Sequence, residues 1–283
     1  MPRLIDTLLR TKLDARMQLT LAKSTVIKAD NVMDYLQETG KPADMEMVRN
    51  LPHVVPPLGD MLVEFNLPRV GAIGWLLHSF DLQKESPKAE FTVSEARWMI
   101  RAYFFVEFAP KQPQMEASYY VNEDGSLHRI TDGEHNVEYY MRPTVGSIYK
   151  KAWEDDPYGQ WMLAPVMSLN VALWTICFMH AKNAIIEAVS APEKLSKRAI
   201  KDYGVPIMRY HVLKIRPMGR ASKDDKGGTH KAHALHIRRG HFKNFTVDKP
   251  LFGKYVGTYW WQQAIVGNEK EGVVLKDYEV QPE

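Results

Sequence analysis

The chain has 283 residues, of which 45% are apolar and 25% are charged, and its formal net charge is +3 at pH 7. The apolar content is enough to bury a substantial core, and the ordinary charged content excludes a wholly disordered chain. The single cysteine, Cys177, excludes an internal disulfide and a cysteine-based zinc cage, which favours a reducing compartment such as the cytoplasm.

Residues 4–38 predict helices near the N-terminus. Apolar residues recur there at steps of three and four, from Leu4 to Leu21, with charged residues between them. Gly40 ends this pattern. The proline-rich segment 51–59 that follows is incompatible with a regular helix, because proline lacks a backbone donor and fixes φ.

The middle of the chain predicts antiparallel strands. We expect strands over 60–65 and 70–80, whereas the aromatic run 98–108 is compatible with a helix or a strand. Residues 115–141 predict a meander of short strands, because turn-forming sequences such as 122–126 separate its apolar runs.

Residues 145–190 are predicted to be mostly helical, and the helix around 160–190 is expected to be buried. The apolar stretch from Leu163 to Ala181 is about as long as a membrane span. It contains polar residues such as Ser168 and Asn170, each of which would need a hydrogen-bonding partner in lipid. We therefore expect a core helix of a soluble fold and no membrane association.

The last third predicts an antiparallel β block. Strands are expected over 207–215, 235–245, 257–265 and 273–280, and the glycine- and lysine-rich segment 217–231 is expected to be a flexible loop. The whole pattern predicts an α+β fold. We expect a core domain of residues 1–200 and a basic, β-rich block of residues 201–283 that packs on the same core.

Positive charge is concentrated in this C-terminal block. Residues 206–254 contain twelve Lys and Arg and three Asp, a net charge of +9, although the whole chain carries only +3. Such clustering attracts phosphates or acidic protein surfaces.

The segment 229–241 concentrates histidine and arginine, with four of the ten histidines of the chain. A strand there puts His236 and Arg238 on one face and Arg239 on the other, and the following glycine permits a bulge that redirects His241. Arginine and lysine suit phosphate contacts, and the aromatic residues downstream offer faces for stacked bases. The residues expected to contact RNA or another partner are His236, Arg238, Arg239, His241, Phe242, Lys243, Trp260 and Trp261.

Other interpretations of this segment stay open. In a metal-independent ribonuclease, His236 and His241 would act as general acid and base while arginine stabilised the charged transition state. A zinc site is disfavoured by the neighbouring glycines, so we expect no metal and no cofactor. In a purely structural interpretation, the charged side chains tie strands together and Trp260 and Trp261 pack within one strand. We favour binding over catalysis.

The string His236-Ile-Arg-Arg-Gly-His-Phe242, followed by Tyr259-Trp-Trp-Gln-Gln-Ala-Ile-Val-Gly267, resembles a C-terminal signature found in phage and mobile-element proteins. The family includes the second of the type V-A anti-CRISPR inhibitors. The chain departs from the signature by carrying Phe242 where tryptophan is usual and by a longer insert over 247–254.

This resemblance implies a phage or mobile-element regulator of host gene expression or defence that acts in the host cytoplasm. It implies contact with RNA, or with the translating ribosome and its nascent chain. An alternative is an inhibitor that binds an acidic protein partner such as a host defence protein.

Overall fold

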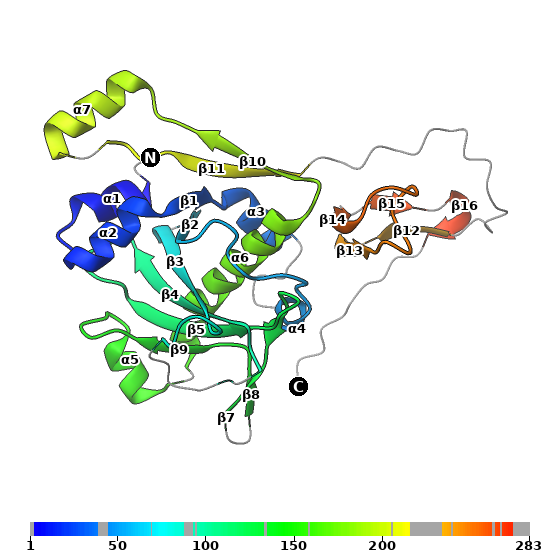
Figure 1. Ribbon diagram of the computed structural model, residues 1–283, viewed down its shortest axis with the longest axis horizontal. Coiled ribbons are helices and arrows are strands. Elements are labelled where there is room, and N and C mark those ends of the chain that lie inside the picture. Colours follow the sequence, from blue (N-terminus) through cyan, green and yellow to red (C-terminus); the bar gives the residue numbers. More distant parts are fainter. Residues whose placement is uncertain are drawn as a thin grey trace. The chain divides into compact units, whose positions relative to one another are not determined.

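The computed structural model describes residues 3–38, 45–68, 70–87, 93, 95–132, 135–157, 159–204, 206–215, 234–238, 240–261, 264–266 and 268–273. It has an α+β fold with N-terminal helices, a largely antiparallel middle, a buried helix and a β-rich C-terminal part (Figure 1). The expected fold class is therefore confirmed.

The chain divides into two compact units. Unit 1 comprises residues 1–180 and 185–214, and unit 2 comprises residues 181–184 and 215–283. Unit 2 thus combines the C-terminal part with four residues from the middle of the chain. The expectation that residues 201–283 pack on the same core as residues 1–200 stays a prediction.

Unit 1 is built on one mixed sheet of nine strands. Their order is β10-β11-β1-β2-β3-β4-β5-β6, with β9 also paired to β5. Strand β1 is parallel to both β11 and β2, and each strand from β2 to β5 is antiparallel to the next. The strands are β1 (Thr25–Lys28), β2 (Met61–Leu67), β3 (Gly71–Asp81), β4 (Trp98–Val106), β5 (Met115–Val121), β6 (Leu127–His128), β9 (Tyr140–Pro143), β10 (Ala184–Val189) and β11 (Tyr210–Ile215). A separate pair joins β7 (Ile130–Asp132) and β8 (His135–Val137).

Local sequence explains where several helices begin and end. The Asp14 carboxylate accepts the backbone N–H groups of Arg16 and Met17 and so caps α2. Gly204 ends α7 with φ of 77°, a left-handed conformation that glycine adopts without strain. The described helices are α1 (Leu4–Arg10), α2 (Ala15–Lys23), α3 (Asp30–Glu38), α4 (Met45–Arg49), α5 (Lys150–Asp155), the 3-10 helix η1 (Gln160–Met162), α6 (Leu163–His180) and α7 (Glu193–Tyr203).

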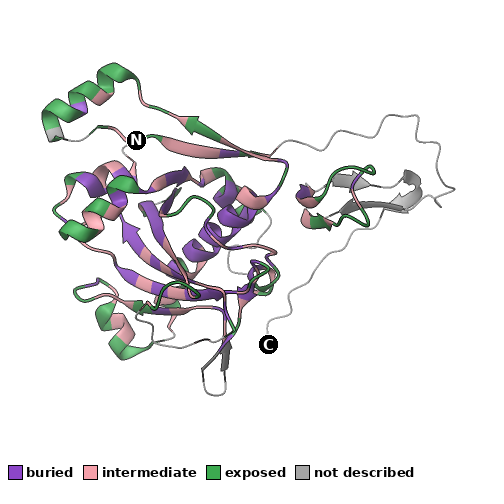
Figure 2. Cartoon of the chain, viewed as in Figure 1, coloured by how far each residue is buried: buried purple, intermediate pink, exposed green. Residues whose placement is uncertain are grey.

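The sheet is covered on both faces, because successive side chains of a strand point in opposite directions. Leu76 packs in one cluster with Leu4 and Leu8 of α1. Its neighbour Trp75 points the other way and donates its indole N–H to the Ser168 hydroxyl of α6 at 2.8 Å. Figure 2 shows buried residues gathered in the central strands and in α6, whereas α5 and α7 are largely exposed.

Helix α6 is apolar around most of its circumference and is buried along most of its length. Residues 160–180 are long and apolar enough to cross a membrane by length and composition, and 67% of an apolar stretch of 18 residues within them is buried inside the protein. A helix that is apolar all round belongs either in a core or in a bilayer, and here its side chains pack within unit 1. The expected buried helix is confirmed.

Two of the expected helical regions contain strands. Residues 25–28 form β1 instead of continuing the N-terminal helices, since Thr25, Val26 and Ile27 are β-branched and pair with β2 and β11 on either side. Residues 184–189 form β10, where helix was expected up to 190. The ambiguous run 98–108 is a strand, β4.

The C-terminal strands are β12 (Ala234–Arg238), β13 (His241–Phe245), β14 (Gly257–Trp261), β15 (Ala264–Val266) and β16 (Asn268–Val273). β12 pairs with β15 antiparallel and with β16 parallel, and β13 pairs with β14. The expected continuous strand 235–245 is therefore two strands in two sheets. The expected loop 217–231 and most of the expected strand 273–280 lie outside the described residues.

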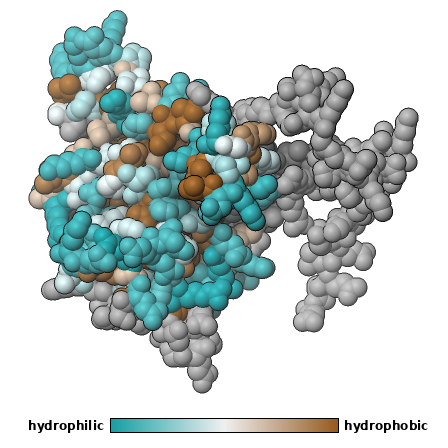
Figure 3. Space-filling view, turned by 45° about the vertical axis from the view of Figure 1, so that its right-hand side comes forward, coloured by the Kyte–Doolittle hydropathy of each residue, from teal (hydrophilic) through white to brown (hydrophobic). Residues whose placement is uncertain are grey.

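The described side chains visible in Figure 3 form a mainly hydrophilic surface, in which hydrophobic residues occur as small separate patches. Scattered exposed apolar residues of this kind are ordinary for a folded protein.

Candidate nucleic-acid interface

The predicted contact residues that the structure describes most fully lie on the hairpin of β13 and β14. His241 is opposite Trp261, Phe242 is opposite Trp260, and Lys243 is opposite Tyr259. Side chains alternate along each strand, so these residues separate onto two faces. One, the Lys243 face, carries His241, Lys243, Phe245, Tyr259 and Trp261. The other, the Trp260 face, carries Phe242 and Trp260.

The Trp260 face is structural. Trp260 is 3% exposed, and its ring centroid lies 4.8 Å from that of Phe242. The Asn183 side chain donates from Nδ2 to the Trp260 carbonyl at 2.9 Å and accepts the Trp260 N–H on Oδ1 at 2.9 Å. Lys182 donates its backbone N–H to the Thr258 carbonyl at 2.8 Å. Residues 181–184 therefore run along β14 and hold its backbone.

The Lys243 face combines a cation with aromatic rings. The exposed Lys243 ammonium lies 5.1 Å from the Phe245 ring centroid and 5.6 Å from that of Trp261. The rings of Phe245 and Trp261 are 5.6 Å apart and are half-buried. An ammonium beside partly open rings can contact a phosphate while a base stacks on a ring.

The other predicted residues precede this hairpin in the chain. His236 and Arg238 lie two positions apart on β12, and their backbones pair with Val266 and Ala264. Their side chains, and the whole of Arg239, lie outside the described residues. The structure thus brings together His241, Lys243 and Trp261 and puts Phe242 and Trp260 on the opposite face.

Asn183 is a site residue that sequence reasoning missed. It lies 77 positions before Trp260 and sits directly after the apolar helix, where nothing in the local pattern links it to the hairpin. Its amide pairs with one donor and one acceptor of the β14 backbone, as a neighbouring strand would.

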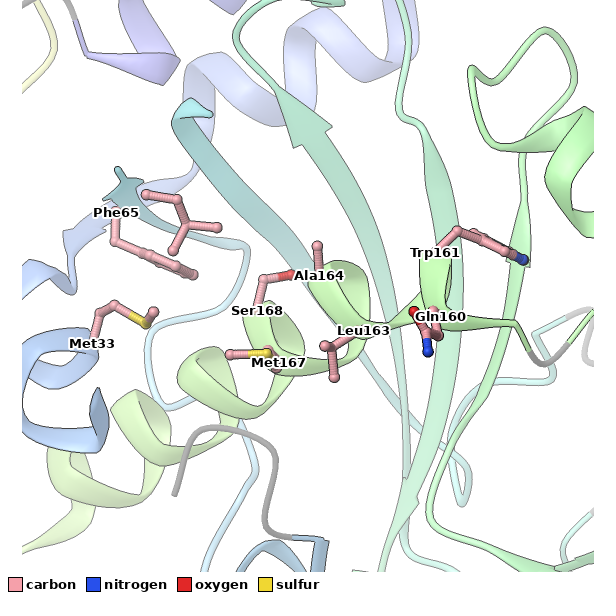
Figure 4. A pocket seen from close by; sticks show the side chains of 9 residues that line it. Met33, Phe65, Gln160, Trp161, Leu163, Ala164, Met167 and Ser168 are labelled. Carbon is pink, nitrogen blue, oxygen red and sulfur yellow. The ribbon is translucent and has the colours of Figure 1, made fainter. Parts of the chain in front are cut away.

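Unit 1 contains an apolar pocket of about 330 Å³ between α3, the end of β2 and the start of α6 (Figure 4). Its Ser168 hydroxyl donates to the Pro165 carbonyl and accepts from Trp75, and the Trp161 indole donates to the Asp156 carbonyl. The lining residues that the structure describes include no charged side chain, and they are Met33, Phe65, Leu67, Gln160, Trp161, Leu163, Ala164, Met167 and Ser168. Such a pocket can hold an apolar group.

Histidine and cysteine also meet in unit 1, at the end of α6. The rings of His53 and His180 have centroids 3.8 Å apart, and His180 Nε2 is 2.7 Å from the Val55 carbonyl oxygen. Burial lowers the pKa of His53 and raises the pKa of Cys177 to about 12. A thiol with that pKa is protonated at neutral pH, which makes Cys177 a poor nucleophile.

Among the residues that the structure describes, no group of three or more His, Cys, Asp or Glu is arranged to hold a metal ion. Comparisons with protein-family models, with curated proteins and with solved structures found no match to this chain. The function proposed below is therefore argued from the chemistry of the chain's own residues.

Proposed function

We propose that this protein binds single-stranded RNA through the Lys243 face of the β13–β14 hairpin. The observation that carries the proposal is the Lys243 ammonium beside the rings of Phe245 and Trp261. Sequence-tolerant binding of single strands uses this pairing of cation and aromatic ring, because every base has a π-face and every nucleotide has a phosphate.

The charge distribution supports the same function. The +9 segment 206–254 includes Lys243, and Arg238 and Arg239 precede the hairpin closely in the chain. Cations gathered along a short segment attract a polyanion and make its binding salt-dependent.

The motif resemblance supports a biological role for this activity. We propose a regulator of phage or mobile-element origin that acts in the host cytoplasm on host gene expression or defence. Its RNA would be a free message or one engaged by a translating ribosome. Metal-independent cleavage by His236 and His241, and capture of an acidic protein, are the alternatives that experiment must separate from binding.

The test measures binding of a labelled 12-nucleotide RNA by fluorescence anisotropy at several salt concentrations. Trp261→Ala is expected to weaken binding about 5- to 150-fold, the usual effect of losing one stacked base. Lys243→Ala is expected to lower the salt slope by about 0.7, the value for one phosphate of a single strand. The matched control, Lys201→Ala, removes an exposed lysine of α7 in unit 1 and is expected to change neither quantity.

Three results would contradict the proposal. Unchanged binding by both hairpin variants would remove the Lys243 face from the interface. Binding of poly-glutamate but not RNA would favour an acidic protein partner. Cleavage of the RNA in EDTA that stops in His241→Ala would show that the protein is a nuclease.

A further inference from the structure

The loop between β13 and β14 contains a tight turn over residues 251–255. Leu251 and Tyr255 form an antiparallel bridge, in which the Leu251 N–H donates to the Tyr255 carbonyl at 2.8 Å and the Tyr255 N–H donates back at 3.0 Å. The Lys254 N–H also donates to the Leu251 carbonyl, at 3.2 Å. Leu251 is buried, so the turn is anchored on one side and projects the residues at its centre.

Phe252 occupies a backbone position that does not suit it. Its φ is 51° and that of Gly253 is 73°. Positive φ at both central residues is the requirement of type I′ turns, which Asn-Gly satisfies most readily. A bulky residue with a Cβ is strained there. Its side chain is 59% exposed, so burial of the ring offsets little of the backbone strain energy. The ring therefore neither favours the turn conformation nor contributes to the hydrophobic core.

Phe252 is accompanied by a second ring and by cations. Tyr255 is exposed, and the Lys254 ammonium lies 4.8 Å from its ring centroid. Lys249 is exposed in the same loop, and Asp248 is the single acidic residue between positions 240 and 261. The turn thus repeats the chemistry of the Lys243 face, an ammonium beside an open aromatic ring.

We infer that Phe252 and Tyr255 form a second stacking site that takes an unpaired nucleobase, with Lys249 and Lys254 contacting the adjoining phosphates. The inference rests on the proposed RNA binding and deepens it. A base inside a duplex has both faces covered by its neighbours, so this site selects unpaired strands. A single strand that follows the hairpin would contact the Lys243 face and the turn in succession.

The experiment compares full-length wild type with Phe252→Asn, which replaces the ring by a side chain suited to this turn. The matched control is Val247→Asn, because Val247 is 80% exposed in the same loop but has no ring. Each is titrated with a 12-nucleotide single strand and with a 12-base-pair duplex RNA. We expect Phe252→Asn to melt at or above the wild-type temperature, to bind the single strand at least 5-fold more weakly, and to bind the duplex equally. Val247→Asn is expected to behave as wild type in both titrations.

The outcomes separate this site from the proposed function. If wild type binds no RNA, both the proposed function and the stacking site are wrong. If wild type binds the single strand and Phe252→Asn binds it equally well, the stacking site alone is wrong. If Val247→Asn loses as much RNA affinity as Phe252→Asn, the loop makes general apolar contact and no stacking site exists. If Phe252→Asn keeps its RNA affinity, and wild type but not this variant sediments with anionic vesicles, the turn binds a bilayer instead. If Phe252→Asn melts lower, Phe252→Gly, which also tolerates positive φ, repeats the titrations.

Discussion

Glu64 is a carboxylate buried beneath the start of α1. It is 2% exposed, and its Oε2 accepts the backbone N–H of Ile5 at 2.9 Å. Burial raises its pKa from 4.5 to about 7, against the opposing effects of that hydrogen bond and of Arg3. The folded state therefore holds the proton more tightly than the unfolded chain does, since burial penalises the charged form.

The raised pKa of Glu64 makes stability depend on pH. Its contribution to the free energy of unfolding is fully present below about pH 4.5 and is lost as pH rises through about 7. We expect Glu64→Gln, which keeps an acceptor for Ile5, to be more stable than wild type by about 3 kcal/mol at pH 8, with little difference at pH 4.5. Urea unfolding across this range measures the effect, and a difference between the two proteins that does not change with pH would contradict it.

Gly125 is a position where only glycine fits. Its φ is 89°, and a Cβ there would lie 1.8 Å from Nδ1 of His53, whose ring centroid lies 3.8 Å from that of His180. We expect Gly125→Ala to lower the free energy of unfolding by about 2 kcal/mol or more, because backbone strain and a steric clash act together. Gly59 has φ of 71° and open space around it, so Gly59→Ala, the control, is expected to cost only about 1 kcal/mol. Equal losses in thermal or urea unfolding would show that the His53 ring moves aside freely.

At the scale of elements, the hairpin depends on a segment far away in the sequence. Asn183 pairs with both backbone polar groups of Trp260, and both residues are buried. Removing the amide leaves a buried donor and a buried acceptor without their partner, which costs more than the hydrogen bonds themselves contribute.

We therefore expect Asn183→Ala to destabilise the hairpin by about 1–3 kcal/mol. In hydrogen exchange this corresponds to roughly 5- to 150-fold faster exchange of amides within 241–261. Asn244→Ala removes an exposed amide from β13 itself and is the matched control. Exchange that is equally fast in both variants would mean that Asn183 does not hold β14.

The elements also show why sequence reasoning succeeded in some places and failed in others. Strands β2 and β3 and helix α6 were predicted closely, because each contains a continuous apolar run. Strand β1 has four residues between two amphipathic helices, too few to interrupt a helical pattern. The break between β12 and β13 was recognised only as a possible bulge at the glycine, because the pairing partners that separate the two strands lie beyond residue 256.

At the scale of the whole molecule, the described residues of the two units differ in how much apolar surface they bury. Unit 1 buries side chains on both faces of a nine-stranded sheet. In unit 2, the buried apolar side chains that the structure describes are Ala181, Leu251, Tyr259 and Trp260. Stability follows buried apolar area, so the hairpin of β13 and β14 is expected to open more readily than the sheet of unit 1.

We expect hydrogen exchange in increasing denaturant to show two steps. Amides of 241–261 should lose protection at a lower denaturant concentration than those of β3, β4 and α6. Protection of α6 should be high without detergent, because most of its side chains are buried and Ser168 accepts a hydrogen bond from Trp75 of the sheet. Simultaneous loss of protection throughout would mean that the units unfold as one, and rapid exchange in α6 would mean that it is not a core helix in solution.

The amino-acid sequence by itself determined the α+β class, the apolar core helix and the concentration of cations and aromatic rings near the C-terminus. These are local properties, because periodicity and charge are carried by neighbouring residues. The tertiary structure decided that Trp260 is buried while Trp261 and Lys243 share the opposite face, and that Asn183 supports them. It also decided that Phe252 projects from a strained turn. Which face of a strand is covered depends on the segments that pair and pack with it, and those segments come from distant parts of the chain.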